Sequence, residues 1–159
     1  GLNAPIMPQL PISPLESIQL CEQLIAQHAI TAVCGSSLGG FYALYLAEKY
    51  SLRCGLINPA ITPWVDMEQA ENHERYEIDE LDLQANGHYV DQLKPYYTPT
   101  LTHPEHFLAL IGLADEVLDP QQMRRHLAAA RQIIVPEGDH AMSDFGGHLD
   151  ELMRFVQSE

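Results

Sequence analysis

The stretch Thr31-Ala-Val-Cys-Gly35-Ser-Ser37-Leu-Gly-Gly40 decides the fold that we expect for this chain. Residues 31–34 form a short, apolar and partly β-branched run, which predicts a buried strand. Residues 35–39 fit the pattern G-x-S-x-G, and the Ala- and Leu-rich residues 41–50 predict a helix directly after it. A nucleophile elbow requires this succession of strand, sharp turn and helix, so we expect Ser37 to stand exposed above a sheet.

The glycines of this turn have a physical role. A sharp turn from strand to helix strains the backbone of the central serine and brings neighbouring chain close, so small residues are expected on both sides of Ser37. The N–H of Leu38 then points from the N-terminus of the helix toward a developing oxyanion. The glycine spacing centres on Ser37 and not on Ser36. The alternative interpretation is a glycine-rich turn that serves only close helix packing.

The rest of the chain alternates between helix and strand patterns. Ser13, Pro14 and Glu16 form a capping box with proline at the first helical position. Asp119 followed by Pro120 predicts the start of another helix. Further strands are predicted at 54–57, 106–111 and 132–135, and a closing amphipathic helix at 149–156.

This alternation predicts an α/β class, with a doubly wound, mostly parallel sheet flanked by helices, because parallel strands need helical crossovers. A chain of 159 residues is expected to form one domain, residues 1–159. In such sheets the chemistry lies beyond the carboxyl ends of the strands, which selects the loops 35–40, 112–119 and 136–140.

A serine hydroxyl needs a base, and His140 follows the last predicted strand in one of these loops. The chain has eight histidines in all. His148, near the start of the last helix, is the only serious rival. The others lie on helices, in an acidic segment or at the wrong end of the sheet. We therefore expect His140 to be the base.

A carboxylate that orients the imidazole completes the set. Asp115 lies just beyond the strand at 106–111. Glu116 is an alternative, whereas Asp119 is better explained as a helix cap. With Asp115 as the acid, the chain order is Ser, Asp, His, which is the order of α/β-hydrolases and differs from that of chymotrypsin or subtilisin.

Together these residues predict a serine hydrolase that works through an acyl-enzyme. His140 removes the Ser37 proton as the hydroxyl attacks an acyl ester carbonyl, and it then protonates the leaving alcohol or thiol. The Leu38 N–H holds the oxyanion, water repeats the cycle, and no metal or other cofactor is needed. The alternatives are a peptidase or lipase that uses the same residues, and a non-catalytic module that binds a ligand or partner.

The composition argues against several partners. A formal net charge of −14 at pH 7 disfavours binding to nucleic acid or to an anionic membrane surface. No run of about 18 apolar residues is present, so no transmembrane helix is expected. Cys21, Cys34 and Cys54 lie in apolar runs without a C-x-x-C pair, which predicts buried free thiols in a reducing compartment. His103-Pro-Glu-His106 is not H-E-x-x-H, so no metal site is expected there.

Residues 60–100 differ from the rest of the chain. Between Asp66 and Asp82 there are eight acidic residues and one basic residue, Arg75, which is typical of a solvated face or loop. The aromatic residues of this region are suited to the apolar side of a lid; they are Trp64, Tyr76, Tyr89, Tyr96 and Tyr97. We therefore expect either a plain surface insertion or a lid over the candidate site.

Motifs along nearly the whole chain resemble those of the YqiA/YcfP-type bacterial esterases of the α/β-hydrolase superfamily, nearer to the YqiA side. The matching stretches are Pro8-Gln-Leu-Pro11, Gly35-Ser-Ser-Leu-Gly-Gly40, Asn58-Pro-Ala60, Asp115-Glu-Val-Leu-Asp119 and Gly138-Asp-His-Ala141. The resemblance implies a cytoplasmic bacterial esterase or thioesterase for small-molecule acyl esters, with Ser37, Asp115 and His140 in the triad positions. The segment 66–88 matches poorly, so substrate preference is not carried over.

One feature of that family has no counterpart in this sequence. Family members begin with a strand that leads into a His-Gly-Phe loop, which supplies the second oxyanion N–H, and no His-Gly-Phe occurs here. We expect that strand to belong beside the nucleophile strand and to precede Gly1, which leaves the domain N-terminally incomplete. An oxyanion hole that loses one donor typically loses a factor of about 10²–10³ in rate.

Overall fold

The computed structural model describes residues 4–68, 88–144 and 146–158. In chain order the elements are α1 (Pro14–His28), β1 (Ala32–Ser37), α2 (Leu38–Tyr50), β2 (Arg53–Pro59), α3 (Pro63–Glu68), α5 (Tyr89–Leu93), the 3-10 helices η3 (Lys94–Tyr96) and η4 (Pro104–His106), β3 (Phe107–Gly112), α6 (Pro120–His126), β4 (Arg131–Val135) and α7 (His148–Gln157). The predicted strands and helices are present, with bounds shifted by a few residues. None of the helices in the described ranges is long and apolar enough to cross a membrane.

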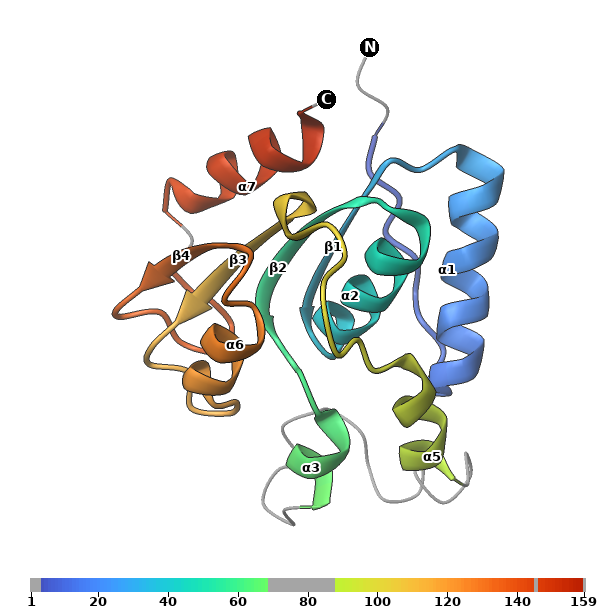
Figure 1. Cartoon of the computed structure of the whole chain (residues 1–159), viewed down its shortest axis with the longest axis horizontal. Coiled ribbons are helices and arrows are strands. Elements are labelled where there is room, and N and C mark those ends of the chain that lie inside the picture. Colours follow the sequence, from blue (N-terminus) through green and yellow to red (C-terminus); the bar gives the residue numbers. More distant parts are fainter. Residues whose placement is uncertain (1–3, 69–87, 145, 159) are drawn as a thin grey trace.

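The strands form one four-stranded parallel sheet in the order β1-β2-β3-β4, which confirms the α/β class and the helix-flanked sheet (Figure 1). The order runs in one direction, whereas a doubly wound sheet reverses its order at a switch point. The doubly wound expectation is therefore wrong for the described strands. When every crossover has the same hand and each new strand is added at the same edge, the connecting helices lie on one face of the sheet. Accordingly, α2 and α6 pack into one core cluster.

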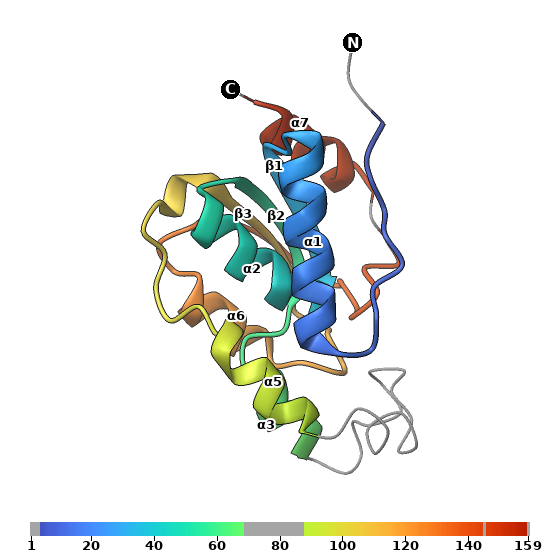
Figure 2. The same ribbon diagram turned by 90° about the vertical axis from the view of Figure 1, so that its right-hand side faces the viewer.

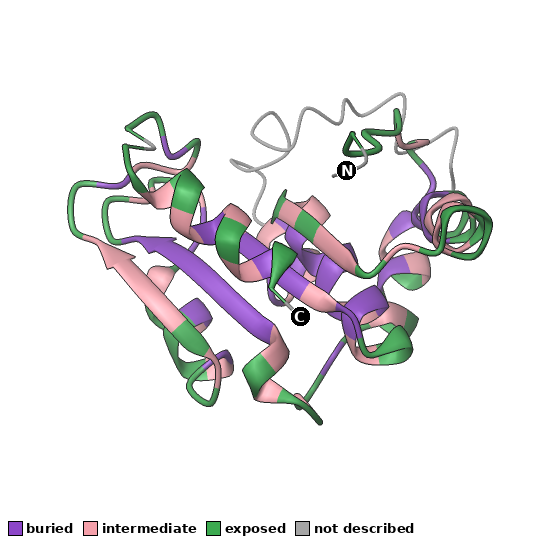
Figure 3. Cartoon of the chain, turned by 90° about the horizontal axis from the view of Figure 1, so that it is seen from above, coloured by how far each residue is buried: buried purple, intermediate pink, exposed green. Residues whose placement is uncertain are grey.

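Strand β3 lies at the centre of the core. All six of its residues are buried, and Figure 3 draws it in the colour of buried residues throughout. Phe107 and Ile111 join the larger cluster with α1, α2 and α6, whereas Leu108 and Leu110 join a smaller cluster with Leu152 of α7. Each fully buried side chain of this size contributes about 1.5–3 kcal/mol, so apolar packing fixes the sheet from both faces.

Strand β1 is an edge of the described sheet, with β2 as its hydrogen-bonded neighbour. Cys34 is exposed there, so the expectations of a buried strand at 31–34 and of a buried Cys34 thiol are wrong. An edge strand lacks the second neighbour that would cover it. Cys54, on the inner strand β2, is completely buried, and this burial raises the pKa of its thiol. All three cysteines are free, as expected, but Cys21 is half-buried and does not meet the expectation of a buried thiol.

The region expected to be an insertion or a lid, residues 60–100, is described in part, because residues 69–87, with most of the acidic run, lie outside the described residues. Its described helices α3 and α5 pack against the helical layer. Trp64 of α3 lies edge-on to Phe41 of α2 and to Tyr97, with ring centroids 6.1 and 5.6 Å apart. The Oε1 of Gln92 on α5 accepts a hydrogen bond of 2.8 Å from Oγ of Ser13, the N-cap of α1. Figure 2 shows α5 below α1 and α2.

Candidate active site

Ser37 ends β1 and Leu38 begins α2, so the serine occupies the turn from strand to helix that the G-x-S-x-G pattern predicted. The Ser37 backbone has φ 54° and ψ −122°. Residues with a side chain rarely adopt this combination, and such strain is concentrated at functional sites. As the first residue of α2, Leu38 has an N–H without an acceptor inside the helix.

The glycines around the elbow differ in how much space surrounds them. A Cβ on Gly35 would lie 2.1 Å from the carbonyl oxygen of Gly39, and one on Gly40 would lie 2.7 Å from Cβ of Pro59. A Cβ on Gly39 would meet no described atom within 4 Å. The close approach predicted for the motif is therefore made at Gly35 and Gly40, and the motif glycine after the serine does not make it.

Three side chains from three loops meet beyond the carboxyl end of the sheet. Nε2 of His140 lies 3.1 Å from Oγ of Ser37, and Nδ1 of the same ring lies 2.9 Å from Oδ2 of Asp115. When Nδ1–H donates to the carboxylate, Nε2 is left to accept the serine proton. The structure therefore brings the three residues chosen from the sequence into one hydrogen-bonded chain.

The Asp115 side chain is completely buried, whereas 17% of the His140 side chain is exposed. The second carboxylate oxygen, Oδ1, accepts hydrogen bonds of 2.8 Å from the backbone N–H groups of Val117 and Leu118. Both oxygens of the carboxylate thus have partners, which offsets the cost of burying the group. These bonds also fix the plane in which the carboxylate meets the imidazole.

The rival acids and the rival base have other positions. Glu116 accepts a hydrogen bond of 3.1 Å from the backbone N–H of His140, whereas Asp115 is the acid hydrogen-bonded to the Nδ1 of its ring. Asp119 is the N-cap of α6 and accepts a 2.8 Å bond from the Gln121 N–H, as expected of a helix cap. His148, the rival base, is the first residue of α7.

The loop that carries the acid and the loop that carries the base make a close backbone contact. Ala114 donates its N–H to the carbonyl of Gly138 at 3.0 Å, and a Cβ on Gly112 would lie 2.3 Å from that same oxygen. Only a glycine at position 112 permits this distance. The backbone contact therefore sets the separation between the loop of Asp115 and the loop of His140.

The turn that carries His140 is closed by hydrogen bonds between Ser143 and Asp139. Ser143 donates to the Asp139 carboxylate twice, from Oγ at 2.6 Å and from the backbone N–H at 2.7 Å. These two bonds lower the pKa of Asp139, the side-chain bond most strongly. Met142 adopts a left-handed φ of 51° in the same turn and is buried.

Asn58 is a site residue that the chemical reasoning on the sequence missed, although it lies in a stretch that matches the family. Its side chain is completely buried between the loops of the acid and the base. No local motif marks it, because its partners are 54 to 82 residues away along the chain. The available signal is an asparagine followed by a proline at the carboxyl end of a strand.

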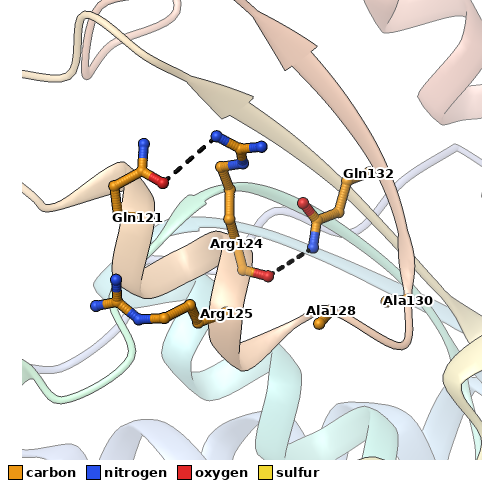
Figure 4. Close-up of a pocket in the computed structure, with 6 residues that line it drawn as sticks. All are labelled: Gln121, Arg124, Arg125, Ala128, Ala130 and Gln132. Carbon is orange, nitrogen blue, oxygen red and sulfur yellow. Dashed lines mark hydrogen bonds between the residues drawn. The ribbon is translucent and has the colours of Figure 1, made fainter.

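A surface hollow of about 510 Å³ lies away from these residues, between α6 and the start of β4 (Figure 4). Gln132, which lines it, is the second residue of β4, whereas His140 follows the other end of that strand. The guanidinium of Arg124 is 3.4 Å from Oε1 of Gln121, and that of Arg125 is 3.9 Å from Asp119. The hollow is thus separate from the candidate active site.

The described ranges contain no group of three or more His, Cys, Asp or Glu side chains that is arranged to hold a metal ion. In the segment 103–106, the rings of His103 and His106 stack with centroids 5.1 Å apart. Nδ1 of His103 lies 3.2 Å from the Glu105 carboxylate.

A model of the uncharacterised protein family UPF0227 matches residues 4–157. The chain belongs to this family. The match confirms the resemblance to the YqiA/YcfP-type family that the motifs indicated.

Solved structures show the same fold at low sequence identity. An α/β hydrolase enzyme from the metagenome of sediments of the lagoon of Mar Chica, Morocco, is 15% identical with a TM-score of 0.64, over 92% of this chain and 76% of that one. An α/β superfamily hydrolase from Oenococcus oeni PSU-1 is 18% identical with a TM-score of 0.58, over 95% and 77%. A monoacylglycerol lipase from Paleococcus ferrophilus is 18% identical with a TM-score of 0.59, over 91% and 75%. The chain therefore has the α/β-hydrolase fold.

The elbow glycines give a first prediction. Gly35→Ala should destabilise the protein by several kcal/mol or prevent folding, because the new methyl group would lie 2.1 Å from backbone that cannot move without breaking the turn. Gly39→Ala is the matched control. Its free energy of unfolding should lie within about 1 kcal/mol of that of the natural protein, because the space around position 39 is open. Urea unfolding followed by circular dichroism measures both. Equal free energies of unfolding for the two variants would contradict the difference in space around Gly35 and Gly39.

The Asp139–Ser143 turn gives a second prediction. A carboxyl whose pKa is lower in the folded state stabilises the fold above its unfolded pKa, and the contribution is lost as the pH falls through the folded pKa. Ser143→Ala removes the strongest cause of that shift. The variant should therefore be less stable than the natural protein at neutral pH, and the difference should shrink on acidification.

Urea unfolding at a series of pH values tests this prediction. The control is Ser143→Ala in an Asp139→Asn background, where no carboxylate remains and the effect of the substitution should not vary with pH. A stability difference that stays constant as the natural turn is acidified would refute the role given to Ser143.

Proposed function

We propose that the protein is a serine hydrolase that cleaves carboxylic acyl esters or thioesters through an acyl-enzyme. The observation that carries this proposal is the hydrogen-bonded chain from Ser37 through His140 to the buried Asp115, with distances of 3.1 and 2.9 Å. A nucleophile, a base and an orienting acid in this arrangement are the requirements for acyl transfer. Membership of a family that resembles YqiA/YcfP-type esterases favours esters or thioesters over peptides.

In the proposed reaction, the Ser37 hydroxyl attacks the carbonyl carbon while Nε2 of His140 takes its proton. The resulting imidazolium is stabilised by the Asp115 carboxylate, which keeps its charge and does not take the proton. The Leu38 N–H, at the positive end of α2, donates to the oxyanion. His140 then gives its proton to the leaving alcohol or thiol, and a water molecule activated in the same way releases the acid.

Labelling with a fluorophosphonate tests the nucleophile. The natural protein should become covalently labelled at Ser37, and Ser37→Ala should not. Ser36→Ala is the matched control, because this neighbouring serine is exposed and should leave labelling unchanged. Labelling of Ser37→Ala would refute the assignment, and absence of labelling in the natural protein would favour a non-catalytic binding module.

The orienting acid is tested by removing its charge. Asp115→Asn should lower kcat for an acyl ester by about 10⁴-fold, because an amide stabilises the wrong imidazole tautomer and does not stabilise imidazolium. Asp119→Asn removes a carboxylate four residues away but keeps a good helix cap, so its kcat should stay unchanged. Assays with acyl esters, thioesters and peptide amides side by side then give the substrate class. A larger loss in Asp119→Asn than in Asp115→Asn would transfer the role to Asp119.

A further inference from the structure

Asn58 occupies an unusual place at the carboxyl end of β2. Its side chain is completely buried and its backbone has a left-handed φ of 39°. The amide oxygen accepts a 2.8 Å hydrogen bond from the Gly112 N–H. The amide nitrogen donates to the carbonyls of Asp139 and His140, at 2.9 and 3.0 Å. One side chain therefore joins the end of β3 to the residue that carries the candidate base.

We propose that Asn58 is a positioning residue that holds His140 at its working distance from Ser37, a role that rests on the function proposed above. The segment 58–60 contacts each of the three stretches of backbone that carry the triad residues. The carbonyl of Ser37 accepts a 2.9 Å bond from the Ala60 N–H, two residues after Asn58. Gly112 leads into the loop of Asp115. The carbonyl of His140 itself is the third contact.

The site requires the chemistry of an asparagine. It needs one acceptor and two donors on a short planar group, which among short side chains only asparagine provides. Aspartate would bring a second acceptor oxygen against two carbonyl groups. Asparagine also tolerates the left-handed backbone better than other residues that have a side chain. The residue type, the backbone conformation and the three bonds therefore agree.

The bonds of Asn58 complete the set of contacts that hold the base. The ring of His140 is held by Asp115, its N–H by Glu116 and its carbonyl by Asn58. Without the Asn58 amide, the His140 carbonyl loses this bond and the Asp139 carbonyl keeps only the 3.1 Å bond from the Met142 N–H of the same turn. No bond from the Asn58 side chain then ties the turn to the end of β2, and the turn is free to move away from the sheet. A displacement of about 1 Å in catalytic geometry typically costs a factor of about 10² in rate. Substrate binding does not use this buried amide, so kcat should fall and KM should not.

The main test variant is Asn58→Gly, which permits the left-handed backbone and removes only the side chain. Its matched control is Ser17→Ala. Ser17 is also completely buried and donates a 2.7 Å bond to the Pro11 carbonyl, but it lies on α1, away from the triad. Both variants lose a buried polar side chain. Only Asn58→Gly should lower kcat and the rate of fluorophosphonate labelling, by about 10²-fold, with KM unchanged.

A second measurement does not depend on turnover. The proton that Nδ1 of His140 shares with Asp115 should give a low-field NMR signal in the natural protein, identified by its loss in Asp115→Asn. In Asn58→Gly this signal should shift or broaden, and in Ser17→Ala it should not. If the natural protein shows the signal but no labelling, the proposed hydrolase function fails, and the NMR comparison still tests the positioning of His140.

The inference is overturned if Asn58→Gly keeps the kcat of Ser17→Ala, or if its low-field signal is that of the natural protein. Should Asn58→Gly fail to fold, Asn58→Ser replaces it, because a hydroxyl retains one hydrogen bond in the same place. Its kcat is then expected to be lower than that of Ser17→Ala, by less than the factor of about 10² expected for loss of the whole side chain. A kcat equal to that of Ser17→Ala would again refute the role of Asn58.

Discussion

Backbone segments at the carboxyl end of the sheet approach one another so closely that the positions of their loops are fixed by contact distances. Gly35 lies against the carbonyl of Gly39, and Gly112 lies against the carbonyl of Gly138. These contacts fold the strand-to-helix turn at Ser37 and bring the loop after β3 beside the loop after β4. The apolar packing of β3 on both faces of the sheet stabilises this crowded end, because the strands cannot separate without exposing both core clusters.

Polar groups within this crowded edge are paired with one another. Every fully buried side-chain oxygen or nitrogen among the described residues has a hydrogen-bond partner. Asp115 illustrates why this matters, since an unpaired carboxylate at that depth would be strongly unfavourable. Its two backbone donors and His140 offset that cost, and the same bonds orient the imidazole toward Ser37. Satisfaction of buried polar groups and arrangement of the candidate site are therefore one physical requirement.

Structural features that depend on neighbouring residues in the sequence were predictable, whereas features that depend on residues far along the chain were not. The elbow at Ser37 and the cap at Asp119 follow from residues within a few positions, so their local structure was expected correctly. The exposure of Cys34 depends on which strands neighbour β1, and an apolar run cannot report that. Asn58 was missed for a similar reason, because its three partners lie on strands and loops far along the chain. The open space at Gly39, against the crowding at Gly40, likewise depends on where Pro59 packs.

The members of the candidate triad are held by different forces, and this difference has a consequence for function. Ser37 is fixed mainly by steric contact, since its turn lies against glycine backbone and α2 is buried from Gly40 to Leu44. The Ala60 N–H adds one hydrogen bond to its carbonyl. His140 is fixed by hydrogen bonds to groups that a single substitution can remove. A change that moves the nucleophile therefore has to disturb closely packed backbone, whereas the loss of one hydrogen bond is enough to release the base. Substitutions in the contacts of the His140 turn are therefore expected to displace the candidate base at a smaller loss of stability than substitutions in the crowded turn at Ser37.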